Sequence, residues 1–240
     1  MREKLRRAQQ DIVARTRLAT MGQIAANISH EIRNPLEAMS GAVEILSGEP
    51  SLNADSRESV AILREEIHNL DDYLNQYLEL ARPVPVRPVS TGVNVLVEDS
   101  LALLKPLLHK KHAKLNSALA QDAPSCTADV NQLKRVIVNV LLNSIEAIPD
   151  HGTLWISTKA CGGRVEIAVR DDGGGIREED LQRVFDPYFT TKSGGSGLGL
   201  PLSKMIIEQH DGSIRVQSRP GEGTVVTVSL PADPKGLADG

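Results

Sequence analysis

The sequence predicts a two-domain α+β protein, in which an N-terminal helical hairpin is followed by an α/β sandwich. Three observations support this fold class. Apolar residues recur at three- and four-residue spacing over about the first 80 residues, prolines then cluster at Pro83, Pro85 and Pro88, and short segments of alternating hydrophobicity follow. We therefore expect a helical domain at residues 1–82, a linker at 83–90, a second domain at 91–232 and a C-terminal tail at 233–240.

The composition limits the classes of function. Of 240 residues, 40% are hydrophobic and only 2% are aromatic, so the core is expected to consist mainly of Leu, Ile, Val and Ala. A net charge of −4 argues against nucleic acid as the main partner. Two cysteines cannot form a disulfide framework, which favours a reducing cytoplasm. No apolar run approaches the ~20 residues that span a bilayer, so we expect either a soluble protein or the cytoplasmic part of a membrane receptor.

The first helix is expected at about residues 1–46 and contains an exposed histidine. Its apolar stripe comprises Met21, Ala25, Ile28, Ile32, Leu36, Met39, Val43 and Leu46. Because each residue turns a helix by about 100°, His30 lies off this stripe and faces solvent, with Glu31 beside it and Asn34 one turn further along. Pro35 is expected to distort the helix near the imidazole. A solvated surface pair is the ordinary alternative for so short a motif.

The second helix has the clearer pattern. Its apolar residues alternate spacings of three and four, as in a heptad seam: Val60, Leu63, Ile67, Leu70, Leu74, Tyr77 and Ala81. Two antiparallel helices with narrow stripes cannot bury those stripes alone, so we expect a homodimeric four-helix bundle. The alternative is a hairpin that packs on its own C-terminal domain.

Beyond the prolines, short strands are expected to alternate with helices. The strands are expected at residues 113–119, 153–158, 165–170, 213–218 and 224–230, and the helices at 93–111, 131–148 and 200–210. A mixed sheet covered by helices on one face is the natural assembly of these elements.

Two polar motifs in this domain indicate a binding site. The helix at 131–148 presents Asn139 and Asn143 on one face, and an amide oxygen suits Mg²⁺, which takes its other ligands from water and phosphates. Asp171 precedes a glycine run that includes Gly173 and Gly175, where the backbone can approach a ligand closely. A buried aspartate there can accept a hydrogen bond from an exocyclic amine such as that of adenine. Taken alone, the asparagine pair is better explained as two surface residues, and the glycine run is compatible with a tight turn.

Further glycines and aromatic residues follow. Gly195, Gly197 and Gly199 lead directly into the helix at 200–210, and backbone N–H groups at a helix N-terminus form a site for phosphate. Phe185 and Phe189, conspicuous in a chain so poor in aromatic residues, are expected to anchor a loop that closes over a nucleotide. The last motif is Gly221-Glu222-Gly223-Thr224.

This ordered set of motifs resembles the nucleotide-binding domain of bacterial sensor histidine kinases, and the stretch from His30 to Leu36 resembles their phospho-acceptor box. The resemblance covers about residues 18–231. It implies that His30 is phosphorylated by ATP and that Glu31 acts as a general base on the imidazole. It also implies that Asn34 positions water for dephosphorylation of a response regulator.

In the second domain the resemblance implies a Mg-ATP site. Asn143 corresponds to the Mg²⁺ ligand, Asn139 to a residue near the phosphates and Asp171 to the residue that reads adenine. The other implied nucleotide contacts are Gly173, Gly175, Phe185, Phe189, Lys192, Gly195, Gly197, Leu198, Gly199 and Thr224. The chain departs from the family in the short segment between Thr191 and Gly195, which gives the lid over the nucleotide little length.

The implied activity is autophosphorylation on His30, followed by phosphotransfer to an aspartate in the receiver domain of a response regulator. Two other classes of function remain open. One is a gyrase-type ATPase, which would need a catalytic carboxylate on the asparagine helix where this chain has Asn139. The other is a catalytically degenerate dimeric scaffold.

Overall fold

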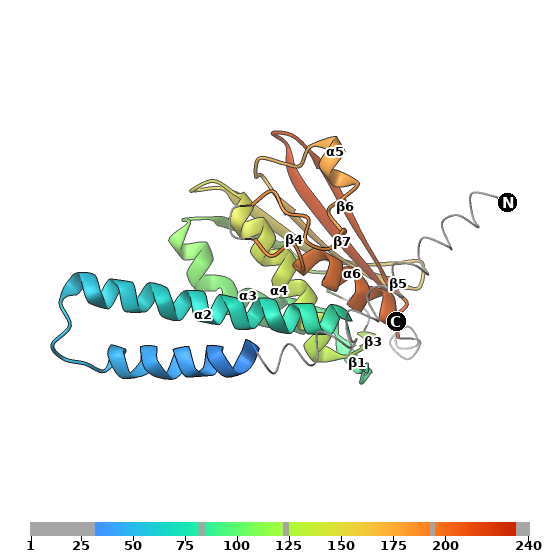
Figure 1. The fold of residues 1–240 in the computed structure, drawn as a ribbon. Coiled ribbons are helices and arrows are strands. Elements are labelled where there is room, and N and C mark those ends of the chain that lie inside the picture. Colours follow the sequence, from blue (N-terminus) through green and yellow to red (C-terminus); the bar gives the residue numbers. More distant parts are fainter. Residues whose placement is uncertain (1–31, 82–84, 122–124, 193–194, 234–240) are drawn as a thin grey trace. The chain divides into compact units, whose positions relative to one another are not determined.

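The computed structural model describes residues 32–81, 85–121, 125–192 and 195–233. The chain divides into two compact units, Met1–Val84 and Pro85–Gly240 (Figure 1). No helix in the described part of the chain is both long and apolar enough to cross a lipid bilayer.

The first unit is a helical hairpin. Its described helices span residues 32–47 and Ala54–Ala81 (α2). Asn53 caps the start of α2, because its side-chain oxygen accepts a hydrogen bond from the Ser56 N–H at 2.8 Å. Pro35 lies within the first of these helices, which continues for three further turns beyond it.

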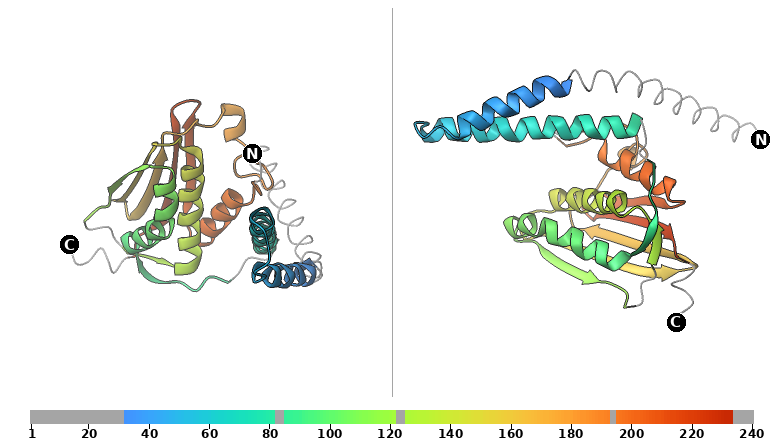
Figure 2. Two further views of the ribbon diagram at one scale, coloured as in Figure 1. Left: turned by 90° about the vertical axis from the view of Figure 1, so that its left-hand side faces the viewer. Right: turned by 90° about the horizontal axis from the view of Figure 1, so that it is seen from below.

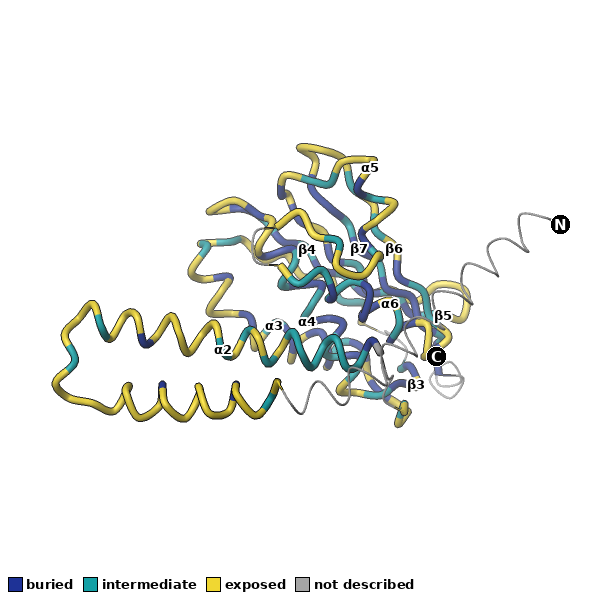
Figure 3. Tube along the Cα trace, in the orientation of Figure 1, coloured by how far each residue is buried: buried dark blue, intermediate teal, exposed yellow. Residues whose placement is uncertain are grey.

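The hairpin buries only part of its apolar surface. Leu36 and Val43 of the first helix and Val60 and Leu80 of α2 are buried. Other members of the two stripes remain between 41% and 53% exposed: Ile32, Met39, Leu46, Leu63 and Leu70. Figure 3 shows the same contrast, since most of the described hairpin is exposed whereas the strands of the second unit are largely buried or intermediate. One copy of the hairpin therefore leaves much of its apolar seam open to solvent.

The second unit contains a five-stranded mixed sheet in the order β2-β4-β5-β7-β6. The strands are β2 (Lys114–Ala118), β4 (Thr153–Cys161), β5 (Arg164–Asp171), β6 (Ser213–Arg219) and β7 (Gly223–Pro231). β2 runs parallel to β4, and the other neighbouring strands are antiparallel. The helices α3 (Val93–Lys110), α4 (Val130–Ala147) and α6 (Gly199–Gln209) cover one face of this sheet (Figure 2).

The core lies between these helices and the sheet. Alternate residues of β4 and β5 point into it, and among the described helices α4 contributes the most buried residues. Its members include Leu133, Ile137, Leu141, Leu154, Ile156, Val165, Ile167 and Val169. The expected two-domain α+β fold, with helices on one face of a mixed sheet, is confirmed.

Three elements were not expected from the sequence. β1 (Val89–Gly92) and β3 (Ser125–Ala128) form a separate two-stranded antiparallel sheet, and α5 (Glu178–Leu181) is a single turn. Residues 89 and 90, at the end of the expected linker at 83–90, belong to β1 and pair with β3. Three of the four residues of β1 are exposed, so the strand has no buried alternation that the sequence could reveal.

Candidate functional site

α4 presents the central polar face of the site. Asp129 caps its N-terminus, because the carboxylate accepts hydrogen bonds from two backbone N–H groups of the first turn. The same carboxylate accepts a hydrogen bond from the Arg87 N–H at 3.0 Å, while the Asp129 N–H donates to His210 Nε2 at 2.9 Å. Although burial alone would raise it, these backbone donors hold the pKa of Asp129 below its ordinary value. The helix is thereby fixed at one end to α6 and to the chain that enters the unit.

A series of amide hydrogen bonds orients the two asparagines of α4. Asn139 Nδ2 donates to Ser203 Oγ of α6 at 2.8 Å, and Ser203 Oγ donates to the Gly199 carbonyl oxygen at 2.9 Å. Asn143 Nδ2 points toward Asn139 Oδ1 at 3.5 Å, which is a long bond. Because the amide nitrogen of Asn143 faces Asn139, its Oδ1 is directed outward and can accept from a cation.

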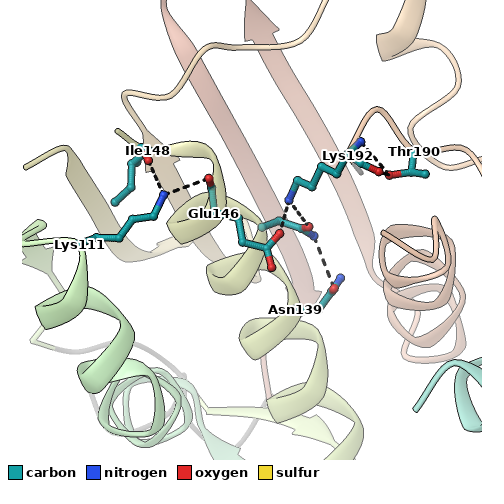
Figure 4. A network of polar contacts seen from close by, with 7 residues as sticks. Lys111, Asn139, Glu146, Ile148, Thr190 and Lys192 are labelled. Atoms are coloured by element: carbon teal, nitrogen blue, oxygen red, sulfur yellow. Dashed lines mark hydrogen bonds and ion pairs between the residues drawn. The ribbon is translucent and has the colours of Figure 1, made fainter. Parts of the chain in front are cut away.

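Lys192 supplies such a cation (Figure 4). Its Nζ lies 3.1 Å from Asn143 Oδ1 and 2.6 Å from Glu146 Oε2. The Lys192 N–H donates to Thr190 Oγ1 at 3.1 Å, so a side chain two residues earlier fixes the turn that presents the lysine. On the other side of this network, Lys111 Nζ binds two carbonyl oxygens at the C-terminus of α4 at 3.2 and 2.7 Å.

Asp171 forms a second part of the site, at the end of β5. It is only 2% exposed, and its Oδ1 accepts hydrogen bonds from the Gly173 and Thr224 N–H groups at 3.0 and 3.2 Å. Ser144, on the buried face of α4, also hydrogen-bonds the carboxylate. Burial raises the pKa of Asp171 above its ordinary value, although these hydrogen bonds oppose the rise. A buried carboxylate of this kind is suited to accept a hydrogen bond from a ligand amine.

Two of the predicted glycines are required by their surroundings. A Cβ atom on Gly173 would lie 2.6 Å from the Ala147 carbonyl oxygen. Gly175 has a φ of 72°, and a Cβ atom there would overlap the Arg219 carbonyl oxygen. The absence of side chains at these positions lets the turn after Asp171 pack directly against the end of α4 and the end of β6.

The two predicted aromatic residues are half-buried, and each lies under a cationic side chain. Lys204 Nζ lies 5.4 Å from the centroid of the Phe185 ring, and the Arg183 guanidinium lies 4.4 Å from that of Phe189. The first contact joins the segment between α5 and Lys192 to α6, and the second lies within that segment.

The loop that contains Lys192 is closed at its base. The Tyr188 N–H donates to the Gly197 carbonyl oxygen at 3.0 Å, so the two arms of the loop meet there. A Cβ atom on Gly195 would lie 2.7 Å from Thr190 Oγ1. Leu198, which is 3% exposed, fills the core just before α6 begins.

The predicted phospho-acceptor residues His30 and Glu31 lie outside the described residues. Asn34 is exposed on the helix at 32–47. Its neighbour Arg33 joins that helix to α2, because Arg33 Nη2 donates to Asn75 Oδ1 at 2.9 Å. This bond links the segment that follows the predicted acceptor to the second helix of the hairpin.

The residues of the second unit fit a magnesium nucleotide. Among the described residues, no three His, Cys, Asp or Glu side chains gather as a metal site. Asn143 offers an amide oxygen to a cation, and Mg²⁺ bound with a nucleotide takes its other ligands from water and phosphate oxygens. Asn143 Oδ1 already accepts from an ammonium group, and Asp171 offers a buried acceptor on another face of α4, where it hydrogen-bonds Ser144, the residue that follows Asn143.

The structure groups most of the predicted nucleotide residues around α4. Asn139, Asn143, Lys192 and Gly199 lie together on one side, and Asp171 with Gly173 and Thr224 on the other. Sequence reasoning missed Ser144 and Ser203. A polar residue at a buried position of an apolar helix face was the available signal for both.

Two family models match the chain. Residues 20–84 match the His Kinase A (phospho-acceptor) domain, and residues 128–234 match the histidine kinase-, DNA gyrase B- and HSP90-like ATPase. A helical hairpin of the first kind, followed by an α/β sandwich of the second, defines a class of signalling proteins. The chain belongs to the sensor histidine kinases and contains the two domains of their catalytic core.

Particular relatives support this assignment. Sporulation kinase E of Bacillus subtilis (strain 168) is 35% identical over 215 residues, which are 89% of this chain and 29% of that protein. The signal transduction histidine-protein kinase AtoS of Escherichia coli (strain K12) is 37% identical over 221 residues, 92% of this chain and 36% of its own. The crystal structure of full-length ShkA in complex with AMPPNP superposes with a TM-score of 0.77 and 26% identity, over 88% of this chain and 46% of that one. The chain thus spans less than half the length of each of these proteins.

Proposed function

We propose that this chain is an ATP-dependent protein-histidine kinase of a two-component system. It transfers the γ-phosphoryl group of Mg-ATP to His30 and from there to an aspartate in the receiver domain of a response regulator. One observation supports this proposal above the others. The helix α4 brings two groups together. Asn143 offers an amide oxygen suited to the metal, and the next residue, Ser144, hydrogen-bonds the buried Asp171 carboxylate, which is suited to adenine.

The proposed reaction depends on positioning and on charge neutralisation. Asp171 accepts a hydrogen bond from the adenine amine, and Asn139 and Asn143 bind at the phosphate end of the nucleotide. When bound, Mg²⁺ neutralises phosphate charge. The backbone at the start of α6 donates N–H groups to the phosphates.

In the phosphoryl transfer itself, a nitrogen of the His30 imidazole forms a bond to the γ-phosphorus while the bond to the ADP oxygen breaks. Glu31 accepts or hydrogen-bonds the proton on the other ring nitrogen, which makes the attacking nitrogen more nucleophilic.

Incubation with γ-labelled ATP and Mg²⁺ tests the proposed activity. Wild-type protein should acquire label that is lost in acid and survives alkali, and His30→Gln should acquire none while still binding ATP. Label retained in His30→Gln contradicts the assignment of the acceptor. Steady ATP turnover without labelled protein would favour the gyrase-type ATPase, and absence of nucleotide binding would favour the scaffold.

We also infer that the hairpin pairs with a second copy to form a four-helix bundle. The exposed seam supports this inference, because Leu63 and Leu70 of α2 are each 50% exposed on the face that the heptad pattern assigns to the core. Leu70→Glu should shift the protein from dimer to monomer in sedimentation equilibrium. Leu115→Glu, at a residue 41% exposed on the edge strand β2, is the matched control and should stay dimeric. Equal dissociation of both variants contradicts the inference.

A dual role as kinase and phosphatase is the last part of the proposal. Asn34 is exposed on the acceptor helix, one turn beyond His30 in sequence, where its amide is accessible to a regulator. Asn34→Ala should label normally but slow the loss of phosphate from the phosphorylated regulator. An unchanged rate of phosphate loss removes this role.

A further inference from the structure

Lys192 occupies the position at which the proposed function requires a metal ion. Its Nζ contacts Asn143 Oδ1 at 3.1 Å and Glu146 Oε2 at 2.6 Å. Amide and carboxylate oxygens are also the ligands that Mg²⁺ prefers in proteins. An ammonium group and a divalent cation at the same amide oxygen repel each other, because they are like charges at short separation. Binding of the metal at Asn143 therefore requires the lysine to leave.

The contact is built into the surrounding structure (Figure 4). Asn143 and Glu146 lie one turn apart on α4, so one ammonium group reaches both side chains. The Glu146 carbonyl oxygen accepts from Lys111 Nζ at 3.2 Å, which holds the end of α4 while the carboxylate extends to Lys192. The hydrogen bond from the Lys192 N–H to Thr190 Oγ1 fixes the backbone from which the lysine extends.

We propose that Glu146 is a positioning residue that retains Lys192 at Asn143 Oδ1 until Mg-ATP binds. This inference rests on the proposed function, in which the site binds Mg-ATP. In the nucleotide-free protein the lysine neutralises the oxygens of α4. In the nucleotide complex the Asn143 oxygen would hold Mg²⁺, and the released ammonium group of Lys192 would become available to the phosphates, which attract it. Glu146 thus opposes nucleotide binding, because its ion pair must break first.

The expected change in nucleotide affinity follows from how far the ion pair between Lys192 and Glu146 is exposed. The side chains of Lys192 and Glu146 are 40% and 58% exposed, and exposed ion pairs are weak. Removing the carboxylate should therefore raise the affinity for a magnesium nucleotide by about two- to fivefold. A different role for Glu146, as a direct or water-mediated metal ligand, predicts weaker binding after the same substitution. The two roles are thus distinguished by the sign of the change.

Titration calorimetry of the full chain with Mg²⁺ and the non-hydrolysable analogue AMPPNP measures this sign. Glu146→Gln should bind more tightly than wild type. Glu166→Gln is the matched control, because Glu166 also pairs with a lysine, Lys159, at 2.9 Å, and loses the same charge. Unchanged or weaker binding by Glu146→Gln, or an equal gain in both variants, overturns the proposal.

Two further measurements test whether the effect acts through Lys192. In a Lys192→Met background, Glu146→Gln should no longer raise the affinity, and a persistent gain overturns the proposal. Without nucleotide, an amine-acetylating reagent should modify Lys192 faster in Glu146→Gln than in wild type, with Lys159 as the internal reference; an unchanged rate overturns it equally. Failure of wild type to bind Mg-AMPPNP contradicts the proposed function itself. If wild type binds it but Glu146→Gln does not bind it more tightly, only the role of Glu146 is contradicted.

Discussion

Gly199→Ala should destabilise the ATP-binding unit through its effect on Asn139. A Cβ atom at position 199 would overlap Asn139 Oδ1 and would lie 3.1 Å from its Cγ and 3.2 Å from its Nδ2. The amide must therefore move by roughly 1 Å to reach an ordinary C···O contact of about 3.3 Å. That movement breaks the 2.8 Å hydrogen bond to Ser203 and leaves a half-buried amide without a good partner.

The expected change in the free energy of unfolding combines a destabilising and a stabilising contribution. An unsatisfied amide costs about 1–3 kcal/mol, and replacing glycine by alanine in a helix returns up to about 1 kcal/mol. We therefore expect the free energy of unfolding to fall by about 1 kcal/mol. In an Asn139→Ala background the overlap is absent and only the helical gain remains, so the same substitution should stabilise the unit by up to about 1 kcal/mol.

Urea denaturation followed by the fluorescence of Trp155, the chain's sole tryptophan, measures both values in the full chain. Trp155 lies on β4 in the ATP-binding unit and so reports on that unit. Gly92→Ala is the control, because the nearest atom to its added Cβ lies 3.7 Å away, on Val95. It should change stability equally in both backgrounds. A Gly199→Ala effect with the same sign and size in both backgrounds refutes the reasoning.

Three further predictions concern buried and capping carboxylates. Asp171→Asn should weaken adenine-nucleotide binding about tenfold or more, because a hydrogen bond to a charged acceptor contributes about 1.5–3 kcal/mol; unchanged affinity by calorimetry would exclude Asp171 from the site. Because the folded-state pKa of Asp171 is raised, its ionisation destabilises the native state. The free energy of unfolding of wild type, measured relative to that of Asp171→Asn, should thus fall as the pH rises from the ordinary pKa of 3.8 through the raised pKa. A difference between the two proteins that does not change with pH in urea denaturation would contradict this. Asp129→Ala should cost about 1 kcal/mol of unfolding free energy through loss of the α4 cap. Since the pKa of Asp129 is lowered in the folded state, the part of this stability loss that depends on the carboxylate charge should be present above the ordinary pKa. It should disappear as the pH falls through the lowered pKa, and denaturation curves at a series of pH values would show this.

Periodic patterns made most of the fold predictable. The helices α3, α4 and α6 and all five strands of the main sheet lie within a few residues of their expected positions. The helices each bury one face, and β4, β5 and β7 alternate buried with less buried residues, whereas β2 is exposed along its whole length. The same period placed Asn139 and Asn143 on one face of α4. β1 and β3 escaped prediction because each has only four residues, and the pairing of β1 contributes little buried surface.

Contacts between distant segments could not be predicted from spacing. Lys192 and Glu146 are 46 residues apart in the sequence, and no local pattern indicates that a lysine of one loop reaches the end of α4. Ser203 similarly orients Asn139 from another helix, 64 residues away. Whether the oxygen or the nitrogen of the Asn143 amide faces outward depends on both contacts, so the detailed chemistry of the site could be derived only from the fold.

Tension on the chain that leads from the hairpin first reaches the ATP-binding unit at the hydrogen bond between the Arg87 N–H and Asp129. The chain from the hairpin enters this unit at Pro85, and two residues later it is fastened to the first turn of α4. Because the Asp129 N–H also holds His210 at the end of α6, tension on the entering chain acts on both helices of the site before it reaches the main sheet. A lengthwise pull on α4 is transmitted stiffly to Asn143, since a helix resists stretching along its hydrogen bonds.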